Sequence, residues 1–424
     1  MMRSARTLSQ FFLRCCALSV PFGLSSRSHE GHEGTRNSYL IIVKLRELRD
    51  LRVFVKRERL AYADMKNALN VWCRISALPC LALALCSLPA PAAADVRIGV
   101  FGLFHPREIV VRSGDGTGLS LHSDRETCAL RGREEAHLVA LRGSVRVSCA
   151  GRAFGAPTLY VDPLAGGISG VEISVPGKIA RKFRGHIEVT SAAGELVPVV
   201  SMDLETAVAS VVAAEQLEVT PLEALKAQAV ATRSYFVATH GRHRGFDFCD
   251  TTHCQFLREP PAAGHPAARA VRETAGLVLA FRGAPLAALY SASCGGHTRS
   301  LADAGFAATD GYPYFAVECA YCVRHAKEWE RRLPLDADAE RLDAARSEAA
   351  RLAVGRSRGW SAVPGNNFDV AREAGSIVLH GRGEGHGVGL CQAGAAALAR
   401  EQHTSFADIL GHYYPGTVLT SGSR

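Results

Sequence analysis

The chain has 424 residues, of which 47% are hydrophobic, with 49 Lys and Arg against 41 Asp and Glu. Residues 1–94 hold 14 of the basic and 6 of the acidic residues, leaving 35 of each in the remaining chain, which is formally neutral. A neutral chain without a basic run offers no positively charged surface for the phosphates of a nucleic acid, which argues against nucleic-acid binding. The composition also excludes collagen, coiled coil and general disorder. The length allows one large or two moderate domains.

Residues 65–94 have the plan of a signal peptide. Lys66 and Arg74 come before an apolar stretch at 77–88, and proline and alanine residues follow that stretch. The stretch is shorter than the about 20 residues of a membrane-spanning helix. We therefore expect a cleaved leader and no stable membrane span in the mature protein.

Cleavage is expected near Ala94, with export to the periplasm or cell envelope. Because a signal peptide normally starts at the initiator, Met65 is the expected start and residues 1–64 an upstream over-extension of the reading frame. The alternative is a cytoplasmic tail with a signal anchor. Export permits disulfides, and eight cysteines are too few for a disulfide scaffold, which leaves individual pairs or a metal site. The eight beyond the leader are Cys128, Cys149, Cys249, Cys254, Cys294, Cys319, Cys322 and Cys391.

Residues 95–169 are expected to form a β-rich N-terminal region. Short apolar runs rich in Val and Ile alternate with turn residues here and continue to about Val200, which predicts an antiparallel β region. Cys128 and Cys149 flank two of these runs and could form a disulfide. No repeat of about 20 to 50 residues occurs, which excludes solenoids and propellers.

The pattern changes at Ser201 and predicts a helical hairpin. Apolar residues recur over 203–216 at the spacing of an amphipathic helix. Thr220-Pro221-Leu222-Glu223 then has the form of a capping box and predicts a second helix over 222–240. Strand-like segments, a polar connection to about Asn367 and a final helix follow. The expected fold is α+β, an N-terminal antiparallel β region followed by a mixed α+β core. The apolar positions of the first helix are Leu204, Ala207, Val208, Val211 and Val212.

Glu215 extends the apolar stripe of the first predicted helix. It follows Val211 by four residues and Val208 by seven. Burial on an apolar face disfavours the charged carboxylate and raises its pKa, which is the state that a general acid needs near neutrality. The alternative is a helix-end glutamate that reaches solvent or pairs with Lys226 or Arg233.

A turn-rich segment over 241–266 carries a candidate metal site. His243, Cys249, His253 and Cys254 lie within 12 residues of it. One such loop could bring three of these side chains to a tetrahedral zinc ion. The spacing equally allows a Cys249–Cys254 disulfide or two free thiols.

Residues 381–394 carry six glycines, five of them at alternate positions. The spacing does not match a dinucleotide-binding fingerprint, but a bare face allows a ligand or another strand to approach closely. His386 and Gln392 are the polar groups that this segment would present, and the alternative is a tightly packed strand without a ligand. Cys319-Ala-Tyr-Cys322 predicts a local disulfide or a thiol pair.

Five motifs, in this order, resemble the SpoIID family, stage II sporulation protein D and its LytB-like amidase-enhancer relatives. The resemblance covers about residues 170–420 and implies a lytic transglycosylase that cleaves peptidoglycan glycan strands, preferring strands stripped of stem peptides. The implied partners are glycan strands and a cell-wall amidase. The motifs are VVAAEQLEVTPLEALKAQAVATRSYFVA, FDFCDTTHCQFL, LYSASCGGHT, GRGEGHGVGLCQAGAAALA and HYYPGT.

The resemblance also implies roles for single residues. Glu215 matches the catalytic acid of the VVxxE motif, and His243, Cys249 and Cys254 match the zinc ligands. The Gln216-Leu217 pair departs from the usual Met-Pro, and Cys391 departs from the usual Ser. Residues expected to contact the glycan are Lys226, Gln228, Arg233, His386 and Gln392.

The implied reaction requires no water nucleophile. The muramyl sugar's own 6-hydroxyl closes on its anomeric carbon, so one carboxyl can suffice where ordinary glycosidases use two. Zinc is expected to shape the loop. The rival classes are a glycan-binding enhancer of an amidase, which does not cut, and a zinc hydrolase that uses a metal-bound water.

Overall fold

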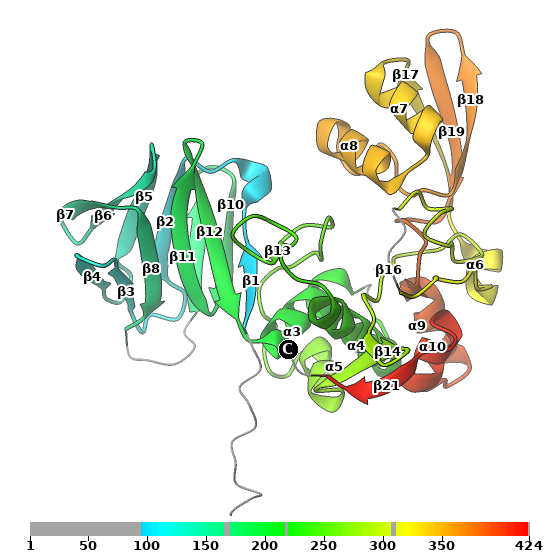
Figure 1. Ribbon diagram of the computed structural model, residues 1–424, viewed down its shortest axis with the longest axis horizontal. Helices are drawn as coiled ribbons and strands as arrows, with labels where there is room; N and C mark the ends of the chain where they lie inside the picture. The colour runs from blue at the N-terminus through cyan, green and yellow to red at the C-terminus, as the bar shows by residue number, and fades with distance from the viewer. Residues whose placement is uncertain (1–94, 165–169, 217–218, 307–310, 423–424) are drawn as a thin grey trace, which may run out of the picture. The chain divides into compact units, whose positions relative to one another are not determined.

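The computed structural model describes residues 95–164, 170–216, 219–306 and 311–422 (Figure 1). The leader and upstream segment predicted for 1–94 lie outside these residues, as does Leu217. Strands dominate up to Met202, and helices and short sheets follow, so the α+β expectation is confirmed. Within the described ranges, no helix is both long and apolar enough to cross a membrane.

Two sheets contain the N-terminal strands. Their strand orders are β13-β1-β12-β11-β8-β3-β4 and β10-β9-β2-β5-β6-β7, and strands from both sides of residue 169 share them. All pairs are antiparallel except β1 with β13. The strands are β1 (Val96–Gly99), β2 (Glu108–Ser113), β3 (Leu119–His122), β4 (Thr127–Leu130), β5 (Glu135–Leu141), β6 (Ser144–Cys149), β7 (Arg152–Ala156), β8 (Thr158–Pro163), β9 (Gly170–Val175), β10 (Ile179–Arg184), β11 (His186–Ala192), β12 (Glu195–Met202) and β13 (Phe248–Cys249), with a 3-10 turn η1 (Gly102–Phe104) after β1.

The alternation of apolar and polar residues sets which face of each strand is buried. In β9, Val171, Ile173 and Val175 are buried and the intervening residues are partly exposed. A strand with this period packs one face on a core and leaves the other in water. The buried faces of both sheets join one core with the buried side of the first helix.

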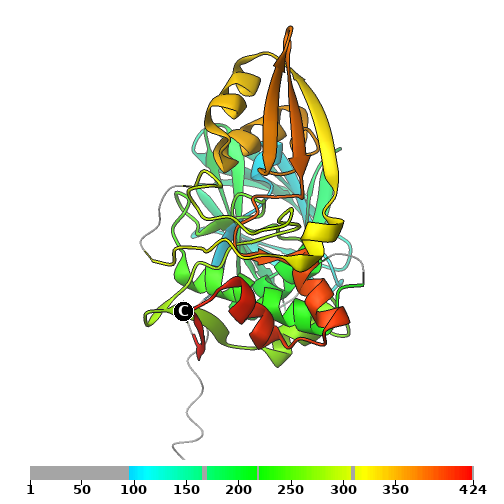
Figure 2. The same ribbon diagram turned by 90° about the vertical axis from the view of Figure 1, so that its right-hand side faces the viewer.

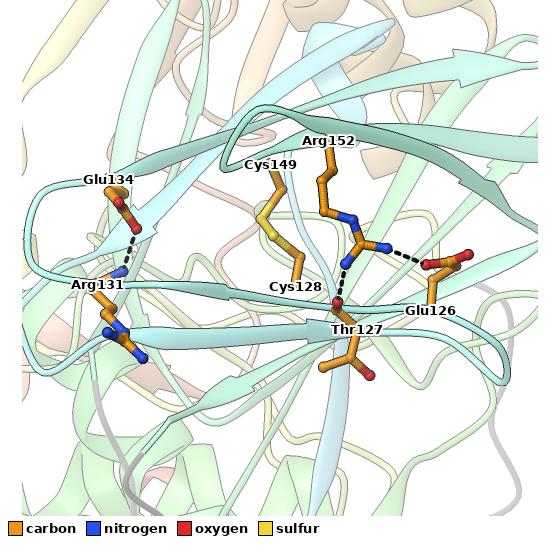
Figure 3. Close-up of a disulfide and its surroundings, with 7 residues drawn as sticks. All are labelled: Glu126, Thr127, Cys128, Arg131, Glu134, Cys149 and Arg152. Carbon is orange, nitrogen blue, oxygen red and sulfur yellow. Dashed lines mark hydrogen bonds and ion pairs between the residues drawn. A yellow bond between two sulfur atoms is a disulfide. The ribbon is translucent and has the colours of Figure 1, made fainter.

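Cys128 and Cys149 form a disulfide, a pairing that the sequence allowed without requiring it (Figure 3). The bond joins β4, at the edge of the first sheet, to the end of β6 in the second. Arg152 lies beside it and donates to the carbonyl of Thr127 at 3.2 Å and to Glu126 at 2.8 Å. The disulfide therefore ties the two sheets together.

The predicted helical hairpin is present as α3 (Leu204–Glu215) and α4 (Leu222–Ala238). Asp203 caps α3 by accepting from the Thr206 N–H at 2.9 Å, and the predicted apolar stripe is buried. The capping box expected for α4 does not form. Pro221 occupies the N-cap position without a side-chain cap, and the Glu223 carboxylate accepts instead from the Phe406 N–H and from Lys226.

The C-terminal half completes the mixed core around α4. Three short sheets have the orders β15-β14-β21, β16-β20 and β17-β19-β18. The elements are α5 (Pro266–Glu273), β14 (Leu277–Phe281), β15 (Ala284–Pro285), β16 (Tyr290–Ser291), α6 (Ala320–His325), β17 (Glu328–Pro334), α7 (Ala337–Ala345), α8 (Glu348–Arg358), β18 (Phe368–Glu373), β19 (Ser376–Arg382), β20 (Leu390–Cys391), α9 (Gln392–Glu401), α10 (Phe406–Tyr413) and β21 (Val418–Ser421).

The segment expected to be a polar connection is in fact structured. Strands β17, β18 and β19 run side by side with α7 and α8 next to them (Figure 2). They enclose a small core that includes Trp329, Leu342 and Phe368. Charged residues separate the apolar ones in β17, so the sequence run looks polar although one of its faces is buried.

We expect the Cys128→Ala/Cys149→Ala variant to lose about 3 kcal/mol of unfolding free energy, because the bond closes a loop with a sequence separation of 21. Denaturant unfolding followed by circular dichroism, without reductant, measures the difference. As a control, a reducing agent should destabilise the wild type and leave the double variant unchanged. Equal stability of the two oxidised proteins would contradict the assignment of this bond.

Candidate functional site

A cavity of about 560 Å³ lies at the C-terminal end of α3. Its walls come from the N-terminal sheets, the loop after β13, strand β16, helix α8 and the glycine-rich segment before β20, so distant parts of the chain meet here. The residues that line it include Glu215, Asp250, Phe256, Tyr290, Trp360 and His386.

Glu215 is the last residue of α3, where the backbone leaves the helix for an extended conformation at Gln216. Its backbone carbonyl accepts a hydrogen bond from Gln392 Nε2 at 3.2 Å. Gln392 is the first residue of α9 and also lines the cavity. The predicted residues Glu215 and Gln392 are therefore brought together, and Gln392 holds the end of the helix that carries the carboxyl.

Burial raises the pKa of Glu215 to about 7. The Phe256 backbone N–H donates to the carboxylate and opposes this effect in part. The alternative, in which Lys226 or Arg233 pairs with Glu215, is not realised. Lys226 pairs with Glu223 and Glu273, and Arg233 pairs with Glu205. A carboxyl with such a pKa can hold its proton near neutrality and also release it.

Two other carboxyls line the cavity, and each is paired with an arginine. Asp250 lies 2.9 Å from Arg181 and accepts from the Phe101 N–H at 3.2 Å, while burial raises its pKa to about 6. Glu348 lies 2.6 Å from Arg351. Among the cavity-lining residues described, Glu215 is thus the carboxyl without an arginine or lysine ion pair.

His386 faces the cavity in a neutral state. Burial lowers its pKa to about 4, and its Nδ1 accepts from the Val388 N–H at 3.0 Å. An acceptor at Nδ1 leaves the ring proton on the other nitrogen. The imidazole therefore offers a cavity ligand a neutral polar group.

The glycine alternation allows another part of the backbone to approach closely, as one of its predicted purposes. Gly383, Gly385, Gly387 and Gly389 have positive φ angles between 72° and 86°. A Cβ at Gly389 would lie 1.9 Å from the Leu289 carbonyl oxygen, so the backbone just before β16 approaches too closely for any side chain. The same segment presents its histidine to the cavity.

The predicted metal loop brings its four donors together. His243 Nε2 lies 3.2 Å from Cys254 Sγ, and His253 Nδ1 lies 3.7 Å from Cys249 Sγ and 3.6 Å from Cys254 Sγ. All four donor atoms lie within 4.8 Å of one another, and both cysteines are free thiols, so the alternative disulfide is not formed. Two sulfur and two nitrogen donors at this spacing fit a tetrahedral zinc ion. Cys254 also lines the cavity, which places this loop in its wall.

Three residues expected to contact a glycan lie elsewhere. Arg233 is fully buried and its guanidinium binds Glu205 and the Leu277 carbonyl. Lys226 is held by its two glutamates, and Gln228 is 97% buried in α4 outside the cavity lining. In α4, Lys226 and Arg233 are thus held by ion pairs, and Gln228 is buried with no hydrogen-bond partner for its Nε2 among the described residues.

Several cavity residues could not be recognised from local sequence patterns. Tyr290, which donates to Gln255 Oε1 at 3.0 Å, lies in a run that looks like an ordinary apolar strand. Arg181 and Asp250 come from elements 69 residues apart. Trp360 is 44% exposed on the loop after α8, and its exposure could not be predicted from the sequence.

Comparisons with known proteins agree with the resemblance seen in the sequence. Residues 192–281 match the model of the stage II sporulation protein family, SpoIID, which confirms the resemblance for the segment holding α3, α4 and the metal loop. An uncharacterized protein of Brachyspira hyodysenteriae is 28% identical over 260 residues, 54% of this chain and 70% of the relative. The amidase enhancer of Bacillus subtilis is 46% identical over 52 residues, 12% of this chain and 7% of that protein.

The raised pKa of Glu215 predicts that Glu215→Gln stabilises the protein at high pH. The unfolded carboxyl ionises near 4.5 and the folded one near 7, so the wild type loses stability between these values. The variant, neutral at every pH, should match the wild type at pH 4 and exceed it by up to about 3 kcal/mol at pH 8. Urea unfolding across this range measures the difference. A difference that does not change with pH would show that Glu215 is not desolvated.

Proposed function

We propose that the protein is an exported peptidoglycan lytic transglycosylase, with its leader cleaved near Ala94, that cleaves peptide-free glycan strands between N-acetylmuramic acid and N-acetylglucosamine. The observation that carries the proposal is the Glu215 carboxyl at the cavity wall, with a pKa of about 7 and no ion pair among the cavity-lining residues described. The match of 192–281 to the SpoIID family and the local similarity to an amidase enhancer support a role at the cell wall.

In this mechanism Glu215 acts twice. The protonated carboxyl first gives its proton to the glycosidic oxygen as the bond to the muramyl anomeric carbon breaks. The 6-hydroxyl of the same muramyl sugar then bonds to that carbon and gives its proton to the Glu215 carboxylate. The products are a 1,6-anhydromuramyl end and a free hydroxyl on the departing sugar, and the enzyme regains its starting protonation state.

The ion pairs of Asp250 and Glu348 support intramolecular attack by the muramyl 6-hydroxyl over hydrolysis by water. Hydrolysis by the usual two-carboxyl route needs a second carboxylate as base or nucleophile. Asp250 and Glu348 are each occupied by an arginine at 2.9 and 2.6 Å. An intramolecular hydroxyl needs no such partner, so Glu215 alone suffices.

The cavity walls suit a sugar chain. The volume of about 560 Å³ falls within the range of about 300 to 1,000 Å³ typical of small-molecule sites. Phe256, Tyr290 and Trp360 line it and offer apolar faces to the C–H bonds of a pyranose ring. Arg258, whose guanidinium lies 4.8 Å from the Phe256 ring centre, adds a positive charge at the wall that complements the lactyl carboxylate of a muramyl sugar.

We also propose that His243, Cys249, His253 and Cys254 hold a structural zinc ion. Four protein donors leave no open position for a water molecule, which favours a structural site over a zinc hydrolase. The bound ion would supply cross-links that fix this loop. The loop residues Cys254 and Gln255 would then hold the cavity wall in place.

Glu215→Gln should remain folded and bind denuded glycan, yet release at least about 100-fold fewer 1,6-anhydromuramyl ends per unit time. Wild-type cleavage should also fall as the pH rises through about 7, because the acid form is then lost. Mass spectrometry of glycan digests measures both. Glu188→Gln serves as the matched control. This carboxyl of β11 pairs with Arg97 of β1, outside the cavity lining, so its loss should leave cleavage unchanged.

Two results would overturn the mechanism. If the wild type releases only reducing muramyl ends, the reaction is hydrolysis. If Glu215→Gln cleaves as fast as the wild type, the acid lies elsewhere.

Cys254→Ser should lose one equivalent of zinc and unfold at a lower temperature than the wild type, because ligand binding energy contributes to folding. Elemental analysis of the purified protein and thermal unfolding measure the two effects. A mapped Cys249–Cys254 disulfide, or unchanged zinc content in Cys254→Ser, would refute this site.

A glycan-binding enhancer of a cell-wall amidase is the second candidate function. The observation that favours it is the local similarity to the Bacillus subtilis amidase enhancer. Under this alternative, the wild type binds denuded glycan and cleaves none of it, while an added amidase works faster in its presence. The same digests, run with and without the amidase, separate the two functions.

A further inference from the structure

Four buried cysteines from three separate segments converge outside the cavity. They are Cys294 after β16, Cys319 and Cys322 at the start of α6, and Cys391 at the end of β20, and none is more than 2% exposed. Their sulfur atoms all lie within 4.8 Å of one another, and the structure records all four as free thiols. The sequence predicted only a local pair at Cys319 and Cys322.

We propose that these four cysteines bind a second, structural zinc ion. A tetrahedral ion with Zn–S bonds of about 2.3 Å places its sulfur atoms about 3.8 Å apart. Cys322 Sγ and Cys391 Sγ lie 3.5 Å apart, and the other separations stay below 4.8 Å. A cluster of several irons would hold the cysteines farther apart, because metal and sulfide ions lie between them. The spacing therefore fits one ion with four sulfur ligands.

The surroundings of the cluster suit thiolates. The backbone N–H groups of Cys294 and Gly394 both donate to Cys391 Sγ at 3.4 Å, and the Tyr413 hydroxyl donates to Cys319 Sγ at 3.4 Å. Hydrogen bonds of this kind orient metal ligands and stabilise their negative charge. They distinguish this cluster from four cysteines that merely fill an apolar core.

Gly394 is required for this packing. A Cβ at this position would lie 2.4 Å from Cys319 Sγ and 2.1 Å from the Tyr413 hydroxyl oxygen. Only a residue without a side chain lets the first turn of α9 approach the sulfur atoms. The fifth motif of the sequence, HYYPGT, supplies Tyr413, and the fourth supplies Cys391 and Gly394.

The proposed site is closed, because four protein sulfurs leave no position for water or substrate. Its effect is to hold α6, α9 and the segment after β16 in one arrangement. Cys391 immediately precedes Gln392, whose amide holds the Glu215 carbonyl. The second site would therefore keep one cavity wall in place, and this consequence rests on the proposed function, whereas metal binding itself does not.

Elemental analysis of the purified full chain tests the proposal. We expect two zinc ions per wild-type chain, one in Cys322→Ser, one in Cys254→Ser and none in the combined variant. The Cys128→Ala/Cys149→Ala variant is the matched control, because it also removes two cysteines and should retain both ions. Wild-type protein with one zinc ion, lost on Cys254→Ser, would overturn the second site and leave the first intact.

X-ray absorption at the zinc edge tests the site even if Cys322→Ser does not fold. In Cys254→Ser, the remaining zinc should show a shell of four sulfur atoms at about 2.3 Å and no nitrogen. A mixed shell of sulfur and nitrogen, an ion other than zinc, or a disulfide mapped between any two of the four cysteines would overturn the proposal. None of these readouts depends on glycan cleavage, so failure of the proposed function would leave this test unaffected.

Discussion

The position of Glu215 depends on an arginine that never reaches the cavity. Arg233 is fully buried in α4, and its guanidinium binds the Glu205 carboxylate of α3 at 2.6 and 2.8 Å, the Leu277 carbonyl of β14 and the Val271 carbonyl of α5. A buried guanidinium must have all these partners, because an unpaired charge in the core costs several kcal/mol. These contacts tie the first turn of α3 to α4, α5 and β14, and the last turn of the same helix carries Glu215.

Two titratable side chains at the cavity, Glu215 and His386, favour their neutral forms. Burial favours the protonated form of Glu215 and the unprotonated form of His386, whereas the remaining carboxyls are matched by arginines. The paired charges cancel, and Arg258 adds a positive charge to the lining. The carboxyl that is left without a counter-charge is the one whose protonation can change during a reaction.

Local patterns predicted much of this site, and long-range contacts could not be predicted. The helical period placed Glu215 on a buried stripe, and 12 residues of one loop were enough to indicate four side chains whose donor atoms meet in the structure. The same motif reasoning assigned Arg233 to the glycan, because a motif does not show which side of a doubly packed helix faces solvent. The meeting of Cys294 with Cys391, 97 residues later, is a property of the fold and has no local signature.

The parallel pairing of β1 with β13 has a consequence for the order of folding. Strand β1 starts two residues after the predicted cleavage point, whereas β13, which carries Cys249, follows about 150 residues later. In a chain that is synthesised N-terminus first, β1 can pair on this edge only after β13 and the loop that contains it have been synthesised. The edge of the first sheet therefore stays open until the chain has been synthesised as far as β13, and closing it is a high-contact-order step.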